Sequence, residues 1–386
     1  MTEANNEDKL PGSILKVRDF YQVDNRVETI LELQGKTWNV YFESDEYAFT
    51  PTWEALLPML VLVGMRKSSK IQMEHGIDAT LLANLAEIQE RLSALDPLFT
   101  PVPIEGVFPA PPLTTHPSRV GLFFSGGVDS WYSFLVHQEE VTDLIWVSGC
   151  DIPLDNQAHL EKSIQLVRKV ADHFGKRLVI MRTNIRSFTD GVFPFYVFQG
   201  NLMQSLSLLF QEAFSRIFFA AALNTSQLVT YGLDPVLIGL WSSSSLQLGY
   251  DGLEADRVQK VARLAQEPFA LQNLRVCWKN PIEGLNCGVC EKCQRTMVNL
   301  EAVGALERCH AFNHPLDLKL ISRVFIEDKD QTVFTQMNLD AILQREGNSP
   351  LARALRNSLQ PPPWKRGWNK LKKMVKKQLR RLPTGT

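Results

Sequence analysis

The stretch Val120–Ser130 constrains the fold more than any other part of the chain. It reads Val-Gly-Leu-Phe-Phe, then Ser-Gly-Gly-Val-Asp-Ser, and leads into the apolar run 131–136. The first five residues predict a buried parallel strand, and the residues after the glycines predict the start of a helix. Glycines allow the backbone to approach a phosphate closely, and the first N–H groups of a helix have no internal partner. The stretch therefore predicts an anion site. It lacks the Lys-Ser/Thr pair of the Walker A pattern, so it is not that type of nucleotide loop.

The hydrophobic pattern around this stretch alternates between strands and helices, which predicts parallel βαβ units and an α/β fold. We expect a doubly wound, five-stranded parallel sheet. Its strands are predicted at 120–124, 143–148, 177–181, 228–231 and 274–278. The helices are predicted at 157–174, 198–223 and 254–266. Ligands of such sheets bind beyond the carboxyl ends of the strands, which is where the glycine turn lies.

The regions flanking this sheet have different compositions. Residues 12–98 show strand patterns at 14–17, 27–33 and 38–42 and helical patterns at 51–65 and 78–95, so we predict a small α+β domain. Residues 99–118 are rich in proline, which predicts an extended linker before the α/β domain at 119–305 that contains the glycine turn. We expect residues 1–11 to be disordered, 306–360 to form a helical extension, and 361–386 to form a basic amphipathic tail.

Four cysteines form the pattern C-x9-C-x2-C-x2-C: Cys277, Cys287, Cys290 and Cys293. Thiolates two residues apart can bind one ion, and a fourth from an earlier segment completes a tetrahedron. Zinc fits such a four-sulfur site, and a site with no open position is structural. An iron–sulfur cluster is the alternative, but nothing else in the sequence indicates redox chemistry.

The glycine stretch resembles the PP-loop of the ATP pyrophosphatases, also called adenine nucleotide alpha hydrolases. The resemblance implies that the loop holds the β- and γ-phosphates of ATP while the α-phosphate is attacked, with Mg²⁺ bridging the phosphates. It implies ATP contacts from Ser125, Gly126, Gly127, Val128, Asp129 and Ser130. Asp129 is the candidate magnesium ligand, and Ser125 and Asp129 are the candidate catalytic residues of the loop.

Other candidate residues lie on neighbouring segments. Ser148 and Gly149 end the second predicted strand, at a corner that in PP-loop proteins lies against the adenine and ribose. Arg257 and Lys260 begin a helix and are candidates for neutralising the pyrophosphate that leaves; a solvated helix face is the alternative. Asp234 and Lys292 are weaker candidates. Cys150 is a candidate sulfur carrier, although a lone cysteine of this kind is more often a small buried residue.

The cysteine pattern after a PP-loop domain resembles the 7-cyano-7-deazaguanine synthase family of queuosine biosynthesis, over about residues 119–305. That family adenylates a carboxylate and lets ammonia displace AMP. The added amino-terminal region, the segment 190–223 and the carboxyl end depart from the family's compact form, so we expect an uncharacterised bacterial branch with a different small-molecule substrate. The expected function is an AMP-forming, C–N bond-forming ligase with ATP, Mg²⁺ and structural Zn²⁺. The alternatives are a tRNA-thiolating enzyme, which also uses PP-loop adenylation, and a non-catalytic nucleotide-binding module.

Charge is unevenly distributed along the chain. The net charge is −1, but residues 361–386 carry nine lysines and arginines and no acid. A basic amphipathic helix suits an anionic membrane surface, and it would also suit RNA phosphates. The start of the sequence shows no signal peptide and no apolar run reaches membrane-spanning length, so we expect a cytoplasmic protein, peripheral to the inner face of the membrane if the tail binds lipid. The sequence does not predict the oligomeric state.

Overall fold

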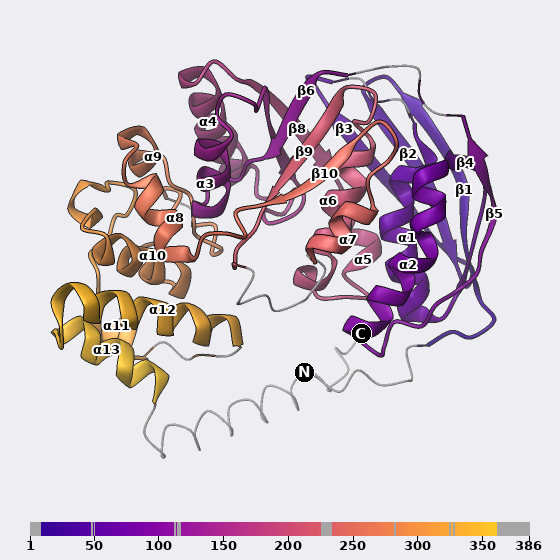
Figure 1. The fold of residues 1–386 in the computed structure, drawn as a ribbon. Helices are drawn as coiled ribbons and strands as arrows, with labels where there is room; N and C mark the ends of the chain where they lie inside the picture. Colours follow the sequence, from indigo (N-terminus) through magenta and orange to yellow (C-terminus); the bar gives the residue numbers. More distant parts are fainter. Residues whose placement is uncertain are drawn as a thin grey trace.

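The computed structural model describes residues 9–360, apart from 48, 50, 112, 114–116, 225–233, 282, 324–325 and 327–328. Within this part of the chain, ten strands form one mostly parallel sheet (Figure 1). The strands are β1 (Ile14–Val23), β2 (Arg26–Leu33), β3 (Lys36–Ser44), β4 (Lys70–Asp78), β5 (Ile104–Ala110), β6 (Arg119–Phe123), β7 (Asp143–Ser148), β8 (Arg177–Thr183), β9 (Phe214–Ala220) and β10 (Gln247–Asp251). The α/β class is therefore confirmed, but the sheet has ten strands where five were predicted.

The strand order is β10-β9-β6-β7-β8-β3-β2-β1-β4-β5. Strands β8, β7, β6, β9 and β10 are mutually parallel. Numbered by their order along the chain and read across the sheet from β8 to β10, they are 3-2-1-4-5. Strand β6 lies at the centre of this block, between β7 and β9, where the order of the strands reverses. In open α/β sheets the ligand crevice lies at such a reversal, beyond the carboxyl ends of the strands.

Helices cover both faces of the parallel block. The longer ones are α1 (Leu57–Lys67), α2 (Ala79–Leu95), α3 (Val128–Val136), α4 (Gln157–His173), α6 (Phe195–Leu208), α8 (Arg257–Leu264), α10 (Glu291–Ala302), α12 (Lys329–Glu346) and α13 (Pro350–Leu359). The shorter ones are η2 (Trp53–Leu56), α5 (Arg186–Thr189), α7 (Pro235–Leu240), α9 (Pro268–Gln272), η4 (Leu306–Arg308) and α11 (Leu318–Arg323). Helices α3, α4, α8 and α10 share one hydrophobic core, and α1, α2 and α6 share the other, on the opposite face (Figure 1). Alternate residues of β6 face the two cores, with Leu122 in the first and Phe123 in the second.

The predicted amino-terminal region is joined to the parallel block by direct strand pairing. Strand β3 pairs antiparallel with β8, with Phe42 opposite Thr183, so the sheet is continuous between the two regions. The separate domain at 12–98 remains a prediction. Strand β4, which was not predicted, lies parallel to β1. The prediction of an extended linker at 99–118 is wrong for Ile104–Ala110, which form β5 and pair with β4. Pro109 is compatible with this strand because β5 is the outermost strand of the sheet.

The predicted helix at 198–223 is wrong in its second half. Helix α6 ends at Leu208, and Phe214–Ala220 is strand β9. Strand β9 pairs with β10 and β6 along its two edges. Its two faces lie against different cores, with Phe219 in one and Phe218 in the other. A strand that is largely buried on both faces lacks a clear alternation of polar and apolar residues, so its mostly apolar sequence after α6 predicts a continuation of the helix.

The predicted strand at 274–278 does not form either. Its amides bond to a side chain and to the glycine loop, not to a neighbouring strand: Val276 N and Cys277 N donate to Asn286 Oδ1, and Arg275 N donates to Gly126 O. The fifth parallel strand is β10 instead. The strand predicted at 228–231 lies outside the described residues.

The helices α11, α12 and α13 form a small cluster that packs against α8 and α10 (Figure 1). The tail at 361–386 and residues 1–8 lie outside the described part of the chain. None of the helices in the described part has the length and apolar character that crossing a bilayer requires.

Candidate functional site

The glycine loop occupies the turn between β6 and α3. Gly126 has a φ of +76°, a conformation that favours glycine, and Gly127 is the N-cap of α3. The loop is tied together by its own hydroxyls: Ser130 Oγ donates to Gly127 O at 3.0 Å, and Ser125 N donates to Ser130 Oγ at 3.3 Å. The strand, glycine turn and helix start predicted from the sequence are therefore present, and they lie at the carboxyl end of the central strand.

Asp129, in the first turn of α3, is held by a buried arginine. Nη1 of Arg257 donates to both carboxylate oxygens, at 2.5 and 2.6 Å, and the Arg257 side chain is only 3% exposed. Burial raises the pKa of Asp129, but the charges of Arg257, Lys260 and Lys292 outweigh it and hold that pKa below its ordinary value. The carboxylate is therefore ionised at neutral pH. Lys260 lies behind this pair, where its Nζ donates to Ala221 O.

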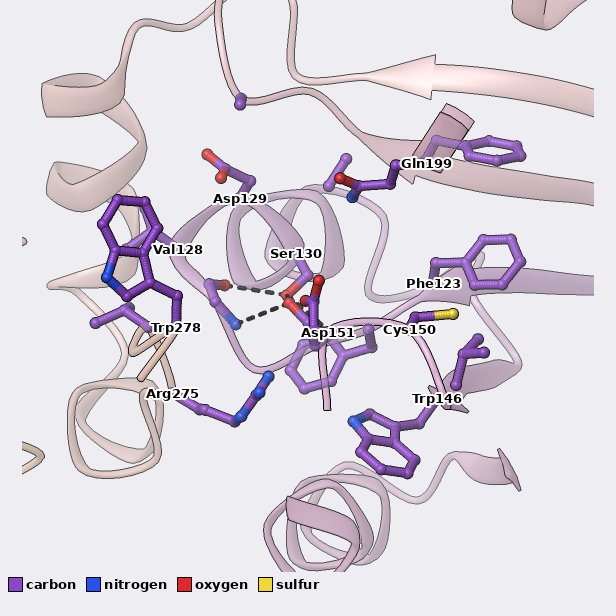
Figure 2. A pocket seen from close by; sticks show the side chains of 18 of the residues that line it. Phe123, Val128, Asp129, Ser130, Trp146, Cys150, Asp151, Gln199, Arg275 and Trp278 are labelled. Atoms are coloured by element: carbon purple, nitrogen blue, oxygen red, sulfur yellow. Dashed lines mark hydrogen bonds between the residues drawn. The ribbon is translucent and has the colours of Figure 1, made fainter. Parts of the chain in front are cut away.

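A cavity of about 460 Å³ opens at this end of the sheet (Figure 2). One part of its wall is polar, and the other is apolar. The polar residues are Ser125, Asp129, Ser130, Asp151, Gln199, Arg257, Arg275 and Lys292. The apolar residues include Phe123, Ile145, Trp146, Met203 and Phe219. A cavity of this size with a few convergent polar groups is typical of a small-molecule site.

Five of the predicted loop residues line this cavity, together with Arg257. The loop residues are Ser125, Gly127, Val128, Asp129 and Ser130. Gly126 lies in the same turn and accepts the backbone bond from Arg275. Among the weaker candidates, Lys292 also lines the cavity, whereas Asp234 caps α7 through bonds from Val236 N and Leu237 N.

Ser148 and Gly149 lie beside the cavity at the end of β7. The residues of this corner that line the cavity are Val147, Cys150 and Asp151. Ser148 is buried and its hydroxyl has no hydrogen-bond partner among the described residues. Gly149 has a φ of +86°, and a Cβ there would lie 2.0 Å from Thr183 O, so a glycine is required for the backbone to pass.

Cys150 lines the cavity but is a buried thiol. Burial is the main cause that raises its pKa well above the ordinary value, and the charge of Asp151 adds to it. The thiol is therefore protonated at neutral pH and is a weak nucleophile.

Arg275, which was not predicted as a site residue, points its side chain into the cavity (Figure 2). It is 6% exposed, and burial lowers the pKa of its guanidinium, an effect that Asp151 opposes. Its Nη2 donates to Asn280 Oδ1 at 3.3 Å, and its Nε has no partner among the described residues. The available signal was an arginine inside the otherwise apolar run 274–278.

The four predicted cysteines come together behind one wall of the cavity. All four sulfur atoms lie within 4.8 Å of one another, with Cys277 and Cys290 3.8 Å apart and Cys287 and Cys293 4.0 Å apart. A tetrahedral zinc with Zn–S bonds of about 2.3 Å places its sulfurs about 3.8 Å apart. The cluster can therefore hold a metal ion such as zinc. Backbone amides of Lys279 and Cys290 already donate to the sulfurs of Cys277 and Cys287, both at 3.3 Å.

Asn286 joins the cysteine cluster to the cavity. Its Oδ1 accepts from Val276 N and Cys277 N at 2.8 and 3.1 Å, and its Nδ2 donates to Leu274 O and Ala311 O at 2.8 and 2.9 Å. Cys277 is at once a cluster residue and a lining residue. The cysteine cluster and the wall that carries Arg275 are therefore joined by direct hydrogen bonds and a shared residue.

No family model, curated protein or solved structure matches this chain. The likeness to the PP-loop superfamily accordingly depends on the residues of the loop and of the cysteine cluster.

Proposed function

We propose that this protein is an ATP-dependent, AMP-forming enzyme that activates a carboxylate or amide oxygen of a small molecule. The observation that carries the proposal is the glycine loop at the carboxyl end of β6, which forms part of the wall of the 460 Å³ cavity together with an ionised Asp129. The loop and the start of α3 supply N–H groups for phosphates, and the apolar side supplies a surface for a base. Asp129 is positioned as a ligand of Mg²⁺, since a carboxylate oxygen is what that ion prefers.

The reaction would proceed in two displacements at this site. An oxygen of the acceptor attacks the α-phosphorus, the bond from that phosphorus to the bridging oxygen breaks, and pyrophosphate leaves. Ammonia or an amine then attacks the activated carbon and AMP leaves with the oxygen. The polar wall of the cavity also carries cations that would stabilise the negative charge that develops on the phosphates. The zinc-type cluster has a structural role in this proposal, because all four positions around the metal are cysteines.

A thiolation reaction is less well supported, because the protonated Cys150 would be a poor sulfur carrier. A non-catalytic nucleotide-binding module would use the same loop. It would bind ATP without releasing pyrophosphate, whereas the enzyme would release it.

The test begins with binding. We expect calorimetry with Mg²⁺ and a non-hydrolysable ATP analogue to detect binding to the wild type and clear weakening in Ser125→Ala and Asp129→Asn. The matched controls are Ser187→Ala and Asp172→Asn, whose side chains are exposed on α5 and α4. Pyrophosphate release from ATP with a panel of small carboxylic acids then tests turnover. If the loop variants bind the analogue as tightly as the controls, the loop is not a nucleotide site; binding without pyrophosphate release for any acid favours the non-catalytic module.

A further inference from the structure

We propose that Arg275 is the side chain that directly binds a phosphate group of the ligand, facing the glycine loop from the wall that the cysteine cluster holds. The inference rests on the proposed function, because it assumes a phosphate-bearing ligand in the same cavity. It extends that function by assigning the anion contact to a residue outside the glycine loop and outside α8.

Arg275 is a buried cation that no described ion pair neutralises. Its side chain is 6% exposed and lines the cavity, and its Nε has no hydrogen-bond partner in the described part of the chain. Its one described side-chain hydrogen-bond partner is the neutral amide of Asn280, and the negative charge of Asp151 acts on it without a direct ion pair among the described residues. A buried, unpaired charge is costly, so a fold keeps one where a ligand completes the pairing.

Two other cations of the site, Arg257 and Lys260, are already bonded to protein atoms. Arg257 gives Nη1 to both oxygens of Asp129, which neutralises its charge. Lys260 donates to Ala221 O and is fully buried behind that pair. Lys292 lines the cavity too and its side chain has no hydrogen-bond partner among the described residues, but the residue is only half-buried. Arg275 is thus a buried cation of the cavity with donors still available.

The backbone of Arg275 is held directly against the glycine loop. Arg275 N donates to Gly126 O at 2.8 Å, and its Cβ lies 3.5 Å from the point that a Cβ on Gly126 would occupy, so the side chain starts against the loop. On the other side, Asn286 bonds to Leu274 O and Val276 N. With its backbone fixed from both sides, the side chain extends towards the region of Ser130 and Asp151 (Figure 2). The planar guanidinium can donate two parallel hydrogen bonds to one phosphate, and little entropy remains to be lost when it does so.

The experiment compares ligands with and without phosphate on matched variants. Calorimetry measures Mg–ATP, inorganic pyrophosphate and adenosine on the wild type, Arg275→Met, Arg275→Lys and the control Arg177→Met, which removes an exposed arginine at the start of β8. We expect Arg275→Met to weaken ATP and pyrophosphate binding by about 10–100-fold, as for loss of a charge-assisted hydrogen bond, and to leave adenosine binding unchanged. Arg275→Lys should retain part of the affinity, and Arg177→Met all of it.

Each result decides the matter. If Arg275→Met binds ATP and pyrophosphate as the wild type does, while Ser125→Ala and Asp129→Asn do not, the inference is wrong and the proposed function stands. If adenosine binding falls in parallel with ATP binding, Arg275 only supports the wall of the cavity. If the wild type binds neither ATP nor pyrophosphate, the proposed function fails first. Should Arg275→Met not fold, Arg275→Gln replaces it. Loss of ATP and pyrophosphate binding in Arg275→Gln, with binding retained in Arg275→Lys, supports the inference. Equal binding of these ligands by the two variants contradicts it.

Discussion

Replacing Asn286 by alanine tests how strongly the cysteine cluster and the cavity wall depend on one side chain. Asn286 is 2% exposed and makes four hydrogen bonds, all to backbone groups, of segments 274–277 and 311. A typical intramolecular hydrogen bond contributes about 1 kcal/mol net, and unsatisfied buried partners cost more. We therefore expect Asn286→Ala to lower the free energy of unfolding by about 3–4 kcal/mol. With the average unfolding entropy per residue, this is a fall in Tm of about 4–5 °C for a chain of this length.

The assay is differential scanning calorimetry together with the zinc content of the purified protein and its affinity for Mg–ATP. The control is Asn25→Ala: Asn25 donates one side-chain bond to Asp45 at 3.2 Å in an exposed turn, so its loss should cost less than about 1 kcal/mol. We expect Asn286→Ala alone to bind zinc and ATP more weakly, since the same bonds position Cys277 and Arg275. Equal Tm values for the two variants, with normal zinc and ATP binding in both, would refute the coupling between the cluster and the cavity.

Two further predictions concern the other end of the site. Gly149→Ala should destabilise the fold by several kcal/mol or prevent folding, because the new Cβ would meet Thr183 O. Gly175→Ala, at a φ of +62° with open space around it, should lower the free energy of unfolding by only about 1–2 kcal/mol. Similar Tm losses in the two variants would contradict this. The pKa of Asp129 is lowered in the folded protein, so the carboxylate contributes stability that is present above its unfolded pKa of about 4 and lost as the pH falls through the lower folded pKa. Chemical denaturation should thus show a difference in the free energy of unfolding between the wild type and Asp129→Asn. This difference should be largest above about pH 5 and should decrease below about pH 4. A difference that stays constant from pH 7 to pH 3 would count against the ion pair with Arg257.

The parts of the fold that could be predicted from the sequence are those with a local signature. Helices α2 and α4 have one apolar stripe each, and they lie within one or two residues of the predicted ranges 78–95 and 157–174. The hairpin of β2 and β3 has an alternating pattern with a glycine turn, Gly35 at a φ of +73°, and it too was predicted. The loop 125–130 carries its own glycines, so its position between a strand and a helix was also predicted.

The errors arose where tertiary surroundings decide the structure. Strand β9 is buried on both faces, so its sequence has no period that distinguishes it from the end of α6. Strand β5 carries Pro109, which argues against a strand in general and is acceptable only on an edge, and the edge position is a property of the whole sheet. Segment 274–278 has the composition of a strand, but Asn286 satisfies its amides from ten residues away.

The same reasoning explains why Arg275 could not be recognised as a site residue. Its neighbours in sequence are apolar, and an isolated arginine in such a run is as compatible with a salt bridge or a solvated edge as with a ligand contact. What distinguishes it is the combination of burial, an unpartnered Nε and a backbone bond to the glycine loop, and all three depend on the cysteine cluster and Asn286 bringing residues 274–277 against residue 126. A metal ion held by the cluster would then act on ligand binding through the position of one cation. Metal removal should accordingly weaken the binding of phosphate ligands more than the binding of adenosine.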